Sequence, residues 1–256
     1  MKTGKVYLVG AGPGDSGLLT LKGLETIKKA DVIIHDRLIS KAILSQIPAR
    51  TRRIYVGKSP KGHSTSQDAI NKVMIEEASK GKTVVRLKGG DPFIFGRGGE
   101  EAQFLRRASI PFEIVPGMSS AHAAPAYAGI PLTHRDHSSS VAIVTGHEGW
   151  SKDGKPVDWK RLAKAADTLV VLMGVSTLPS IVEALIRGGR SKDTPIAVIE
   201  KGTTSKQRVT TGVLADIVAK VNRTKVKPPA VIVVGEVVKL RDELAWFRGS
   251  KLESKR

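Results

Sequence analysis

Two glycine-rich segments each follow a short apolar run, and each carries a carboxylate. The first is residues 10–17, Gly-Ala-Gly-Pro-Gly-Asp-Ser-Gly, and the second is residues 88–96, Lys-Gly-Gly-Asp-Pro-Phe-Ile-Phe-Gly. Glycine permits left-handed backbone angles and close backbone approach, so such segments form tight turns that can lie against a ligand. Their acids, Asp15 and Asp91, favour a cationic or hydroxyl-rich ligand over a phosphate. A nucleoside with a sulfonium and an ammonium group meets that requirement.

Two other interpretations of these turns are open. Gly12, Gly14 and Gly17 satisfy the spacing of the dinucleotide fingerprint, which makes a nicotinamide-dependent oxidoreductase the first alternative. Pro13 argues against it, because proline lacks the N–H that a pyrophosphate needs, and Asp15 would place a negative charge beside that dianion. In the second alternative, both segments are only tight connections between a strand and a helix, without a ligand.

The composition restricts the class of protein. A chain of 256 residues with 40% hydrophobic content can bury a sizeable core, as one large domain or two smaller ones. The absence of cysteine excludes disulfides, thiolate metal sites and cysteine nucleophiles. No apolar run approaches the roughly 18 residues that span a bilayer, and residues 6–11 are too short for a signal peptide. We therefore expect a cytoplasmic protein that does not bind membranes.

The net charge of +18 favours a polyanionic partner: nucleic acid, an anionic membrane, or a substrate with several carboxylates. Aromatic residues make up only 4% of the chain, too few for an obvious base-stacking platform, and the basic residues are scattered. A nucleic-acid-binding module is therefore disfavoured. A solvated basic surface explains the charge as well as an anionic substrate does.

Short apolar runs alternate with segments of helical periodicity, which predicts an α/β fold with mostly parallel sheets. The expected strands of the first half are residues 6–9, 32–35, 53–56, 83–87 and 112–115. After a polar stretch, the alternation resumes with expected strands at 141–145, 168–173, 195–199, 208–211 and 230–234. We expect α/β domains at 1–135 and 136–248 and a polar tail at 249–256, with ligands at the carboxyl ends of the strands.

An ordered set of motifs covers nearly the whole chain, from about Gly4 to about Arg248. It comprises Val-Gly-Ala-Gly-Pro-Gly-Asp at 9–15, Asp-Arg-Leu at 36–38, Val-Gly-Lys at 56–58, the segment 86–101, Val-Pro-Gly at 115–117 and Gly-Ile-Pro-Leu-Thr-His-Arg at 129–135. In these motifs the sequence resembles the uroporphyrinogen-III C-methyltransferases, which belong to the tetrapyrrole (class III) methylases.

The resemblance implies two α/β domains with a cofactor cleft between them, and a homodimer. The N-terminal domain would carry the substrate and the catalytic residues, and the C-terminal domain would complete the cleft. The implied reaction transfers methyl groups from S-adenosyl-L-methionine to C2 and C7 of uroporphyrinogen III. Its products would be precorrin-2, for sirohaem and cobalamin biosynthesis, and S-adenosyl-L-homocysteine, with no metal. Another precorrin methyltransferase of the same fold is the alternative within the family.

The resemblance also implies roles for individual residues. Asp36 would accept a proton, and Lys58 would either donate one or hold a substrate carboxylate. Arg37, Arg97 and Arg135 are our candidates for binding the carboxylates of the substrate. The implied cofactor contacts are Pro13, Gly89, Gly90, Asp91, Ile94, Ser119, Ser120, Met173 and Gly202.

Two of these positions are affected by departures from the family pattern. Members commonly have Thr-Ala where this chain has Ser119-Ser120, so a small apolar neighbour has become polar. They often have tyrosine before the aspartate, where this chain has His35. We expect the second change to alter the hydrogen bonding around Asp36.

Overall fold

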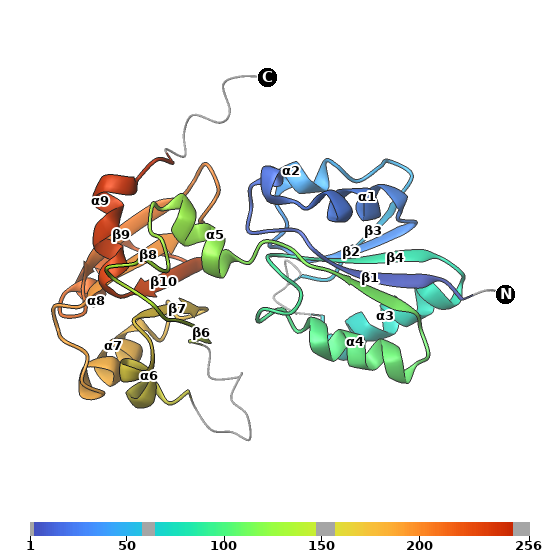
Figure 1. Cartoon of the computed structure of the whole chain (residues 1–256). Coiled ribbons are helices and arrows are strands. Elements are labelled where there is room, and N and C mark those ends of the chain that lie inside the picture. Colours follow the sequence, from blue (N-terminus) through green and yellow to red (C-terminus); the bar gives the residue numbers. More distant parts are fainter. Residues whose placement is uncertain (1–2, 58–64, 147–156, 248–256) are drawn as a thin grey trace. The chain divides into compact units, whose positions relative to one another are not determined.

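The computed structural model describes residues 3–57, 65–146 and 157–247 of the chain. The chain divides into two compact units, Met1–Ser119 and Ser120–Arg256, and each is built from one five-stranded sheet with helices (Figure 1).

The sheet of the first unit is entirely parallel. Its strand order is β3-β2-β4-β1-β5, and all four pairings run in the same direction. The strands are β1 (Lys5–Gly10), β2 (Val32–His35), β3 (Arg52–Tyr55), β4 (Thr83–Lys88) and β5 (Phe112–Val115). Because β1 lies between β4 and β5, the turns that follow these three strands leave the sheet side by side.

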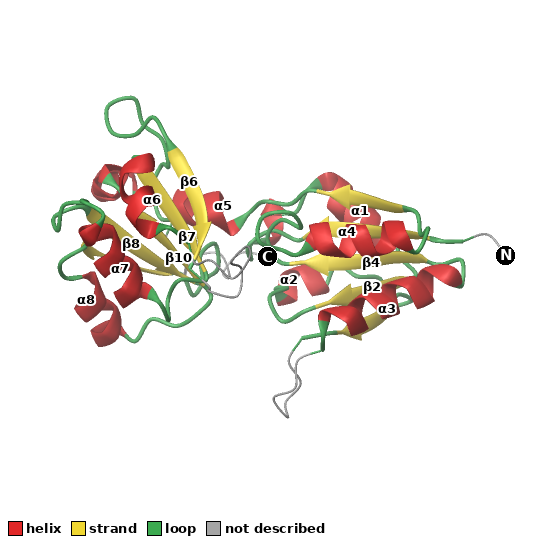
Figure 2. Ribbon diagram, turned by 90° about the horizontal axis from the view of Figure 1, so that it is seen from below, coloured by secondary structure: helices red, strands yellow, loops and turns green. Residues whose placement is uncertain are grey.

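Helices cover both faces of this sheet. The 3-10 helix η1 (Ser16–Leu18) and helices α1 (Leu21–Lys29) and α2 (Lys41–Leu44) follow the first and second strands, while α3 (Gln67–Ser79) and α4 (Gly98–Arg107) cover the opposite face. Figure 2 shows α3 and α4 in front of the strands. Side-chain oxygens cap the N-termini of four of these helices; for example, Thr20 Oγ1 accepts from the N–H of Gly23 at 3.0 Å, and Ser66 Oγ accepts from the N–H of Ala69 at 3.2 Å.

Alternation along β4 assigns its side chains to the two faces. Val85 and Leu87 belong to the core cluster beneath α1 and α2, whereas Val84 packs with the residues of α3 and α4. Successive side chains of a strand point to opposite faces, so Arg86 and Lys88 share the face of Val84. Two cations of a buried strand are thereby directed toward α3 and α4.

The sheet of the second unit is mixed. Its strands are β6 (Val141–Thr145), β7 (Thr168–Leu172), β8 (Pro195–Glu200), β9 (Arg208–Val213) and β10 (Ala230–Val234), in the order β6-β7-β10-β8-β9. Within the described part of this second sheet, β6 and β7 pair in parallel, and the other three pairings are antiparallel.

Helices α6 (Trp159–Ala165), α7 (Leu178–Arg187) and α8 (Ile217–Thr224) contribute apolar residues to one core cluster of this unit. Helix α5 (Ser120–Tyr127) contacts β7 and β10. The 3-10 helix η4 (Glu236–Leu240) and helix α9 (Arg241–Leu244) follow β10. No helix within the described ranges is both long and apolar enough to cross a membrane.

The predicted α/β fold is confirmed, and two details of the organisation differ from the sequence expectation. The second sheet is mixed rather than mostly parallel, because β10, the last strand, enters between β7 and β8 in the antiparallel direction. The units divide between Ser119 and Ser120, earlier than the expected boundary after residue 135. The contacts of α5 with β7 and β10 account for this difference, since they tie residues 120–127 to the second sheet.

Glu77 of α3 is a buried carboxylate near the start of the strands of the first sheet. Its oxygens accept from Lys80 Nζ and Lys82 Nζ, each at 2.7 Å, and from Arg52 Nη1 at 3.1 Å. Hydrogen bonds lower the pKa of Glu77 from 4.5 to about 2; the bond from Lys80 has the largest effect, and the bond from Lys82 has the next largest. Because the folded pKa is the lower one, the carboxylate stabilises the fold above pH 4.5 and loses this effect as the pH falls toward 2.

We therefore expect Glu77→Gln to lower the free energy of unfolding by about 1–3 kcal/mol at neutral pH, because a charged acceptor of three hydrogen bonds is lost. The difference from the wild type should shrink as the pH falls below the unfolded value of 4.5. Urea unfolding at neutral pH and near pH 3 measures it. A difference of equal size at both pH values would contradict this account.

Candidate functional site

The two acid-bearing glycine turns are joined to each other by backbone hydrogen bonds. The N–H of Gly12 donates to the carbonyl of Gly90 at 3.1 Å, and the N–H of Gly90 donates to the carbonyl of Gly12 at 2.7 Å. Ala11 N–H donates to the carbonyl of Lys88 at 2.8 Å. The turns meet because β1 and β4 are neighbours whose carboxyl ends lie at the same edge of the sheet.

The turn after β5 joins the same group, and its glycine permits the contact. A Cβ atom added at Gly117 would lie 2.5 Å from the carbonyl oxygen of Gly90, and one at Gly10 would lie 2.6 Å from the Cα of Gly117. Real Cβ atoms do not approach backbone that closely. Gly12 and Gly90 in addition have φ angles of +78° and +69°, which favour glycine. The ends of β1, β4 and β5 therefore form one compact set of turns.

Asp91 holds this set of turns together. Its Oδ1 accepts from the N–H groups of Phe93 at 2.7 Å and Ile94 at 3.1 Å, and its Oδ2 accepts from Gly117 at 3.0 Å. Asp15 has a similar local role, since its Oδ1 accepts from the N–H of Gly17 at 2.8 Å at the start of η1. Each acid that the sequence offered as evidence for a cationic ligand thus has backbone partners in the turns themselves.

Exposed apolar side chains surround these turns. Leu38, Phe93 and Ile94 are 52%, 55% and 41% exposed, although each closely follows a buried strand of the first sheet. A Cβ at Gly89 would lie 2.9 Å from the Cβ of Leu38, so the turn after β4 packs directly on the one after β2. Large apolar side chains left open at the edge of a sheet provide a surface for a flat, weakly polar group such as a nucleoside base.

Asp36 lies at the same edge, directly after β2. Its Oδ1 accepts from the N–H of Leu38 at 2.9 Å, and its Oδ2 lies 3.4 Å from Nη2 of Arg86. Its side chain is 28% exposed, so solvent or a ligand can reach it. The cation beside it is that of the buried Arg86, while the side chain of the adjacent Arg37 is exposed. His35 contacts Tyr55 edge to face, with ring centroids 5.6 Å apart.

Arg97 is the N-cap residue of α4 and has a left-handed backbone, with a φ of 59°, and its side chain remains on the surface. It pairs with Glu100, with Nη2 2.7 Å from Oε2. That hydrogen bond holds the pKa of Glu100 below its usual range. Arg97 and Glu100 line a surface hollow together with Gln67 and Asn71 of α3. A substrate carboxylate could therefore reach Arg97 only in competition with Glu100.

Three predicted cofactor positions lie in the second unit. Met173 follows β7 with a φ of 56° and a 40% exposed side chain. Gly202 follows β8, and a Cβ there would lie 2.5 Å from the Cβ of Ala124, so this turn packs against α5. Ser120 is the first residue of α5. The structure thus brings the helix of Ser120 to the turn of Gly202.

The remaining predicted residues are distributed as follows. Pro13, Gly89, Gly90, Asp91, Ile94 and the buried Ser119 belong to the first unit, together with Asp36, Arg37 and Arg97. The exposed Arg135 belongs to the second unit. Lys58 lies outside the described residues. Among the residues that the structure does describe, no cluster of three histidines or carboxylates is placed to hold a metal ion.

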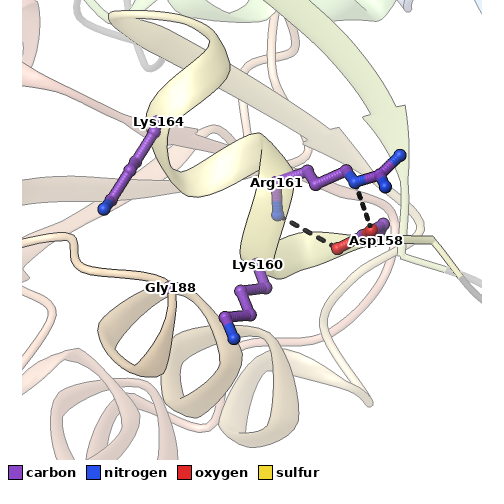
Figure 3. Close-up of a pocket in the computed structure, with 5 residues that line it drawn as sticks. All are labelled: Asp158, Lys160, Arg161, Lys164 and Gly188. Carbon is purple, nitrogen blue, oxygen red and sulfur yellow. Dashed lines mark hydrogen bonds and ion pairs between the residues drawn. The ribbon is translucent and has the colours of Figure 1, made fainter.

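A hollow in the second unit contains none of the predicted site residues. It is lined by Asp158, Lys160, Arg161 and Lys164 around α6, and by Gly188 (Figure 3). Asp158 accepts from the N–H of Arg161 at 3.0 Å and pairs with its guanidinium, so its carboxylate starts the helix. The structure gives this hollow no chemistry beyond that of a capped helix with basic side chains.

The sequence model of the tetrapyrrole (corrin/porphyrin) methylases matches residues 5–218. The chain belongs to this family. It is 54% identical over 245 residues to the S-adenosyl-L-methionine-dependent uroporphyrinogen III methyltransferase of Methanosarcina barkeri, with 96% of each chain covered. It is also 52% identical to the siroheme synthase of Pseudomonas entomophila. That match covers 97% of this chain but 53% of the relative, so this methylase spans about half of that protein.

The fold of this tetrapyrrole methylase is also that of a solved structure. The uroporphyrin-III C-methyl transferase of Thermus thermophilus, complexed with S-adenyl homocysteine, superposes with a TM-score of 0.80 at 41% identity. The match covers 93% of this chain and all of the other.

Sequence reasoning about this methylase missed a group of buried charges. Arg86, Lys88 and Glu101 have side chains only 5%, 6% and 0% exposed, and they lie between β4 and α4. Burial lowers the pKa of the Lys88 ammonium, and the nearby cation of Arg86 lowers it further. The available signal was the pattern of β4, in which two cations alternate with apolar residues in an otherwise buried strand.

Proposed function

We propose that this chain transfers methyl groups from S-adenosyl-L-methionine to C2 and C7 of uroporphyrinogen III, giving precorrin-2. The observation that carries the proposal is the 54% identity to the Methanosarcina barkeri methyltransferase across nearly the whole of both chains. The 41% identical Thermus thermophilus structure, with its bound S-adenyl homocysteine, supports the choice of cofactor. Precorrin-2 would serve sirohaem or cobalamin biosynthesis, and we further propose a cytoplasmic homodimer.

The turns of the first unit fit the adenosyl group better than a dinucleotide. Leu38, Phe93 and Ile94 offer exposed apolar surface beside Gly89. Pro13 lacks the N–H donor that a pyrophosphate would need, but a nucleoside without phosphates does not need that donor. We propose Pro13, Gly89, Gly90, Asp91, Ile94 and Ser119 as contacts of the first unit. Ser120, Met173 and Gly202 are the proposed contacts of the second.

When bound, the cofactor supplies a methyl group from its sulfonium, and the residues of the chain align the two reactants. Such alignment can remove several kcal/mol of the barrier, roughly 7–11 at best. In our proposal, Asp36 accepts the proton that leaves the tetrapyrrole after methyl transfer. Its 28% exposure keeps one side of the carboxylate accessible. Lys58 would donate a proton or hold a substrate carboxylate.

The direct test is incubation of the protein with S-adenosyl-L-methionine and uroporphyrinogen III, followed by mass analysis of the tetrapyrrole. The expected result is a mass gain of two methyl groups that requires both reactants. The same assay with a precorrin acceptor separates this activity from that of the other precorrin methyltransferases. No mass gain on uroporphyrinogen III would refute the specific assignment.

The proposed carboxylate ligands predict a dependence on salt. Arg37, Arg97 and Arg135 are exposed cations, and salt screens interactions between exposed charges. We expect the KM for uroporphyrinogen III to rise several-fold between low salt and about 0.5 M salt, where the Debye length falls below ~5 Å, with a smaller change in kcat. The KM for S-adenosyl-L-methionine in the same assays is the control. A KM for the tetrapyrrole that ignores salt would contradict the electrostatic account.

A further inference from the structure

A buried network of charges connects α4 to Asp36. At its centre, Oε1 of Glu101 accepts from Lys88 Nζ at 3.0 Å, from Gln67 Nε2 at 3.1 Å and from Arg86 Nε at 3.2 Å. Gln67 also donates to Asn71 of the same helix at 3.2 Å. The network leaves the protein interior at Asp36, which is 28% exposed, compared with 0–6% for the three buried charges.

The balance of charge explains why Asp36 belongs to this network. Arg86 and Lys88 bring two positive charges into the interior, where an unpaired charge is costly. Glu101 provides one buried negative charge, and Asp36 provides the second at the edge of the sheet. An apolar strand would pack at less cost, so stability alone gives no reason for two cations in β4.

The guanidinium of Arg86 is held in one orientation. Nε donates to Glu101, and Nη1 lies 3.4 Å from the carbonyl of Ile34 and 3.3 Å from that of Leu87. Because the group is planar and its donors are fixed relative to one another, these contacts also set the direction of Nη2. Nη2 is the atom that lies 3.4 Å from Oδ2 of Asp36.

Both oxygens of Asp36 therefore have a defined donor from the protein. The N–H of Leu38 donates to Oδ1 at 2.9 Å, and Arg86 faces Oδ2. The contact with Arg86 is longer than the roughly 2.7–2.9 Å of a strong charge-assisted hydrogen bond. It restrains the carboxylate without enclosing it, and the exposed side of the carboxylate stays open to a substrate.

We infer that Arg86 is a positioning residue that orients the carboxylate of Asp36, and that Glu101 keeps Arg86 in place for this task. The inference rests on the proposed function, because it takes Asp36 as the proton acceptor. Neither Arg86 nor Glu101 touches the reactants in this account. Their effect on methyl transfer passes entirely through Asp36.

The chain offers a matched control for the burial of charge. Glu77 is, like Glu101, a buried helix carboxylate, and it accepts from three cations, with its side chain 5% exposed. It lies near Arg52 and Lys82 at the starting ends of the strands, whereas Asp36 and Lys88 are at the carboxyl ends. Glu77→Gln therefore removes a comparable ion network without touching Asp36.

The test combines Arg86→Gln, Glu101→Gln and Glu77→Gln with Asp36→Asn in the full chain. For each single and double variant, single-turnover assays give the rate of methyl transfer, calorimetry gives the Kd for S-adenosyl-L-methionine, and urea unfolding gives the stability. We expect Arg86→Gln and Glu101→Gln each to lower the rate by roughly 10- to 100-fold with an unchanged Kd, because a small misplacement of a reacting group has effects of this size. Glu77→Gln should leave the rate unchanged.

The Asp36→Asn background decides between positioning and a merely structural role. If Arg86 acts through Asp36, Arg86→Gln changes the residual rate of Asp36→Asn by no more than about twofold, since residues that act as a unit are not additive. A full rate loss in both backgrounds overturns the inference. Should Arg86→Gln fail to fold, the isosteric Glu101→Gln takes its place in the same cycle.

The outcomes also separate this inference from the proposed function. A wild-type protein that methylates no uroporphyrinogen III refutes the function itself. If the wild type is active and Asp36→Asn keeps the full rate, the proposed function stands. The inference that Arg86 orients Asp36 for proton transfer is then refuted. An Arg86→Lys variant with wild-type stability but a reduced rate supports the inference, because lysine keeps the buried cation without the planar set of donors that directs Nη2 at Asp36.

Discussion

Replacement of Asp36 by asparagine is expected to lower the rate of methyl transfer by at least about 100-fold while leaving the binding of S-adenosyl-L-methionine unchanged, because general acid–base groups contribute factors of this size. Asparagine keeps an acceptor for the N–H of Leu38, so the turn after β2 should persist. It cannot accept a proton near neutral pH. Single-turnover rates and calorimetric binding of the cofactor measure the two effects separately.

Asp31 provides the control, since it precedes the same strand that Asp36 follows. Its carboxylate accepts from the N–H of Thr83 at 2.8 Å, at the starting edge of the sheet. Asp31→Asn should therefore leave the rate unchanged. If Asp36→Asn instead binds the cofactor weakly, and its rate recovers at saturating cofactor, then Asp36 is a cofactor ligand.

Replacement of Gly117 by alanine is expected to destabilise the protein and to weaken cofactor binding together. The new Cβ would lie 2.5 Å from the carbonyl oxygen of Gly90 and 2.7 Å from the backbone of Gly10, and backbone atoms cannot yield as a flexible side chain can. Overpacking of this kind costs about 1–3 kcal/mol, occasionally more. The shift should also break the hydrogen bond from Gly117 to Asp91, which orders the turn of the proposed cofactor contacts.

Gly99 offers the matched control, because it is the second residue of α4 and a Cβ there meets nothing within 4 Å. Gly99→Ala should raise the free energy of unfolding by at most about 0.5–1 kcal/mol, the value for replacing glycine by alanine in a helix interior. Urea unfolding and calorimetry with S-adenosyl-L-methionine on both variants test the pair. A Gly117→Ala variant with wild-type stability and affinity would show that the three turns do not depend on close backbone approach.

Much of the architecture was predictable because it depends on local patterns. Each expected strand overlaps an observed one, since buried strands in this chain are short apolar runs between helical segments. The convergence of the glycine turns followed from the parallel first sheet, because its strands end at one edge. Glycine at 10, 12, 90 and 117 also indicated tight turns from residue type alone.

Other features depend on partners that are distant in the sequence. Nothing near β10 indicated that it would enter the second sheet between β7 and β8 and make it mixed. The assignment of α5 to the second unit depends on its contacts with β7 and β10, which the polar stretch after it concealed. Strand order and packing of this kind are set by the burial of whole elements, which local pattern does not report.

The same distinction applies to the candidate site. The sequence by itself determined the residue types at the strand ends: glycines, the carboxylates of Asp36 and Asp91, and cations. Only the tertiary structure decided what each carboxylate does, because hydrogen-bond partners come from other elements. Asp91 accepts from Gly117, 26 residues away, and Asp36 faces Arg86, 50 residues away. The position of a buried charge such as Arg86 depends on these long-range partners, because the protein interior tolerates a cation only where carboxylates and carbonyls lie close enough to stabilise it.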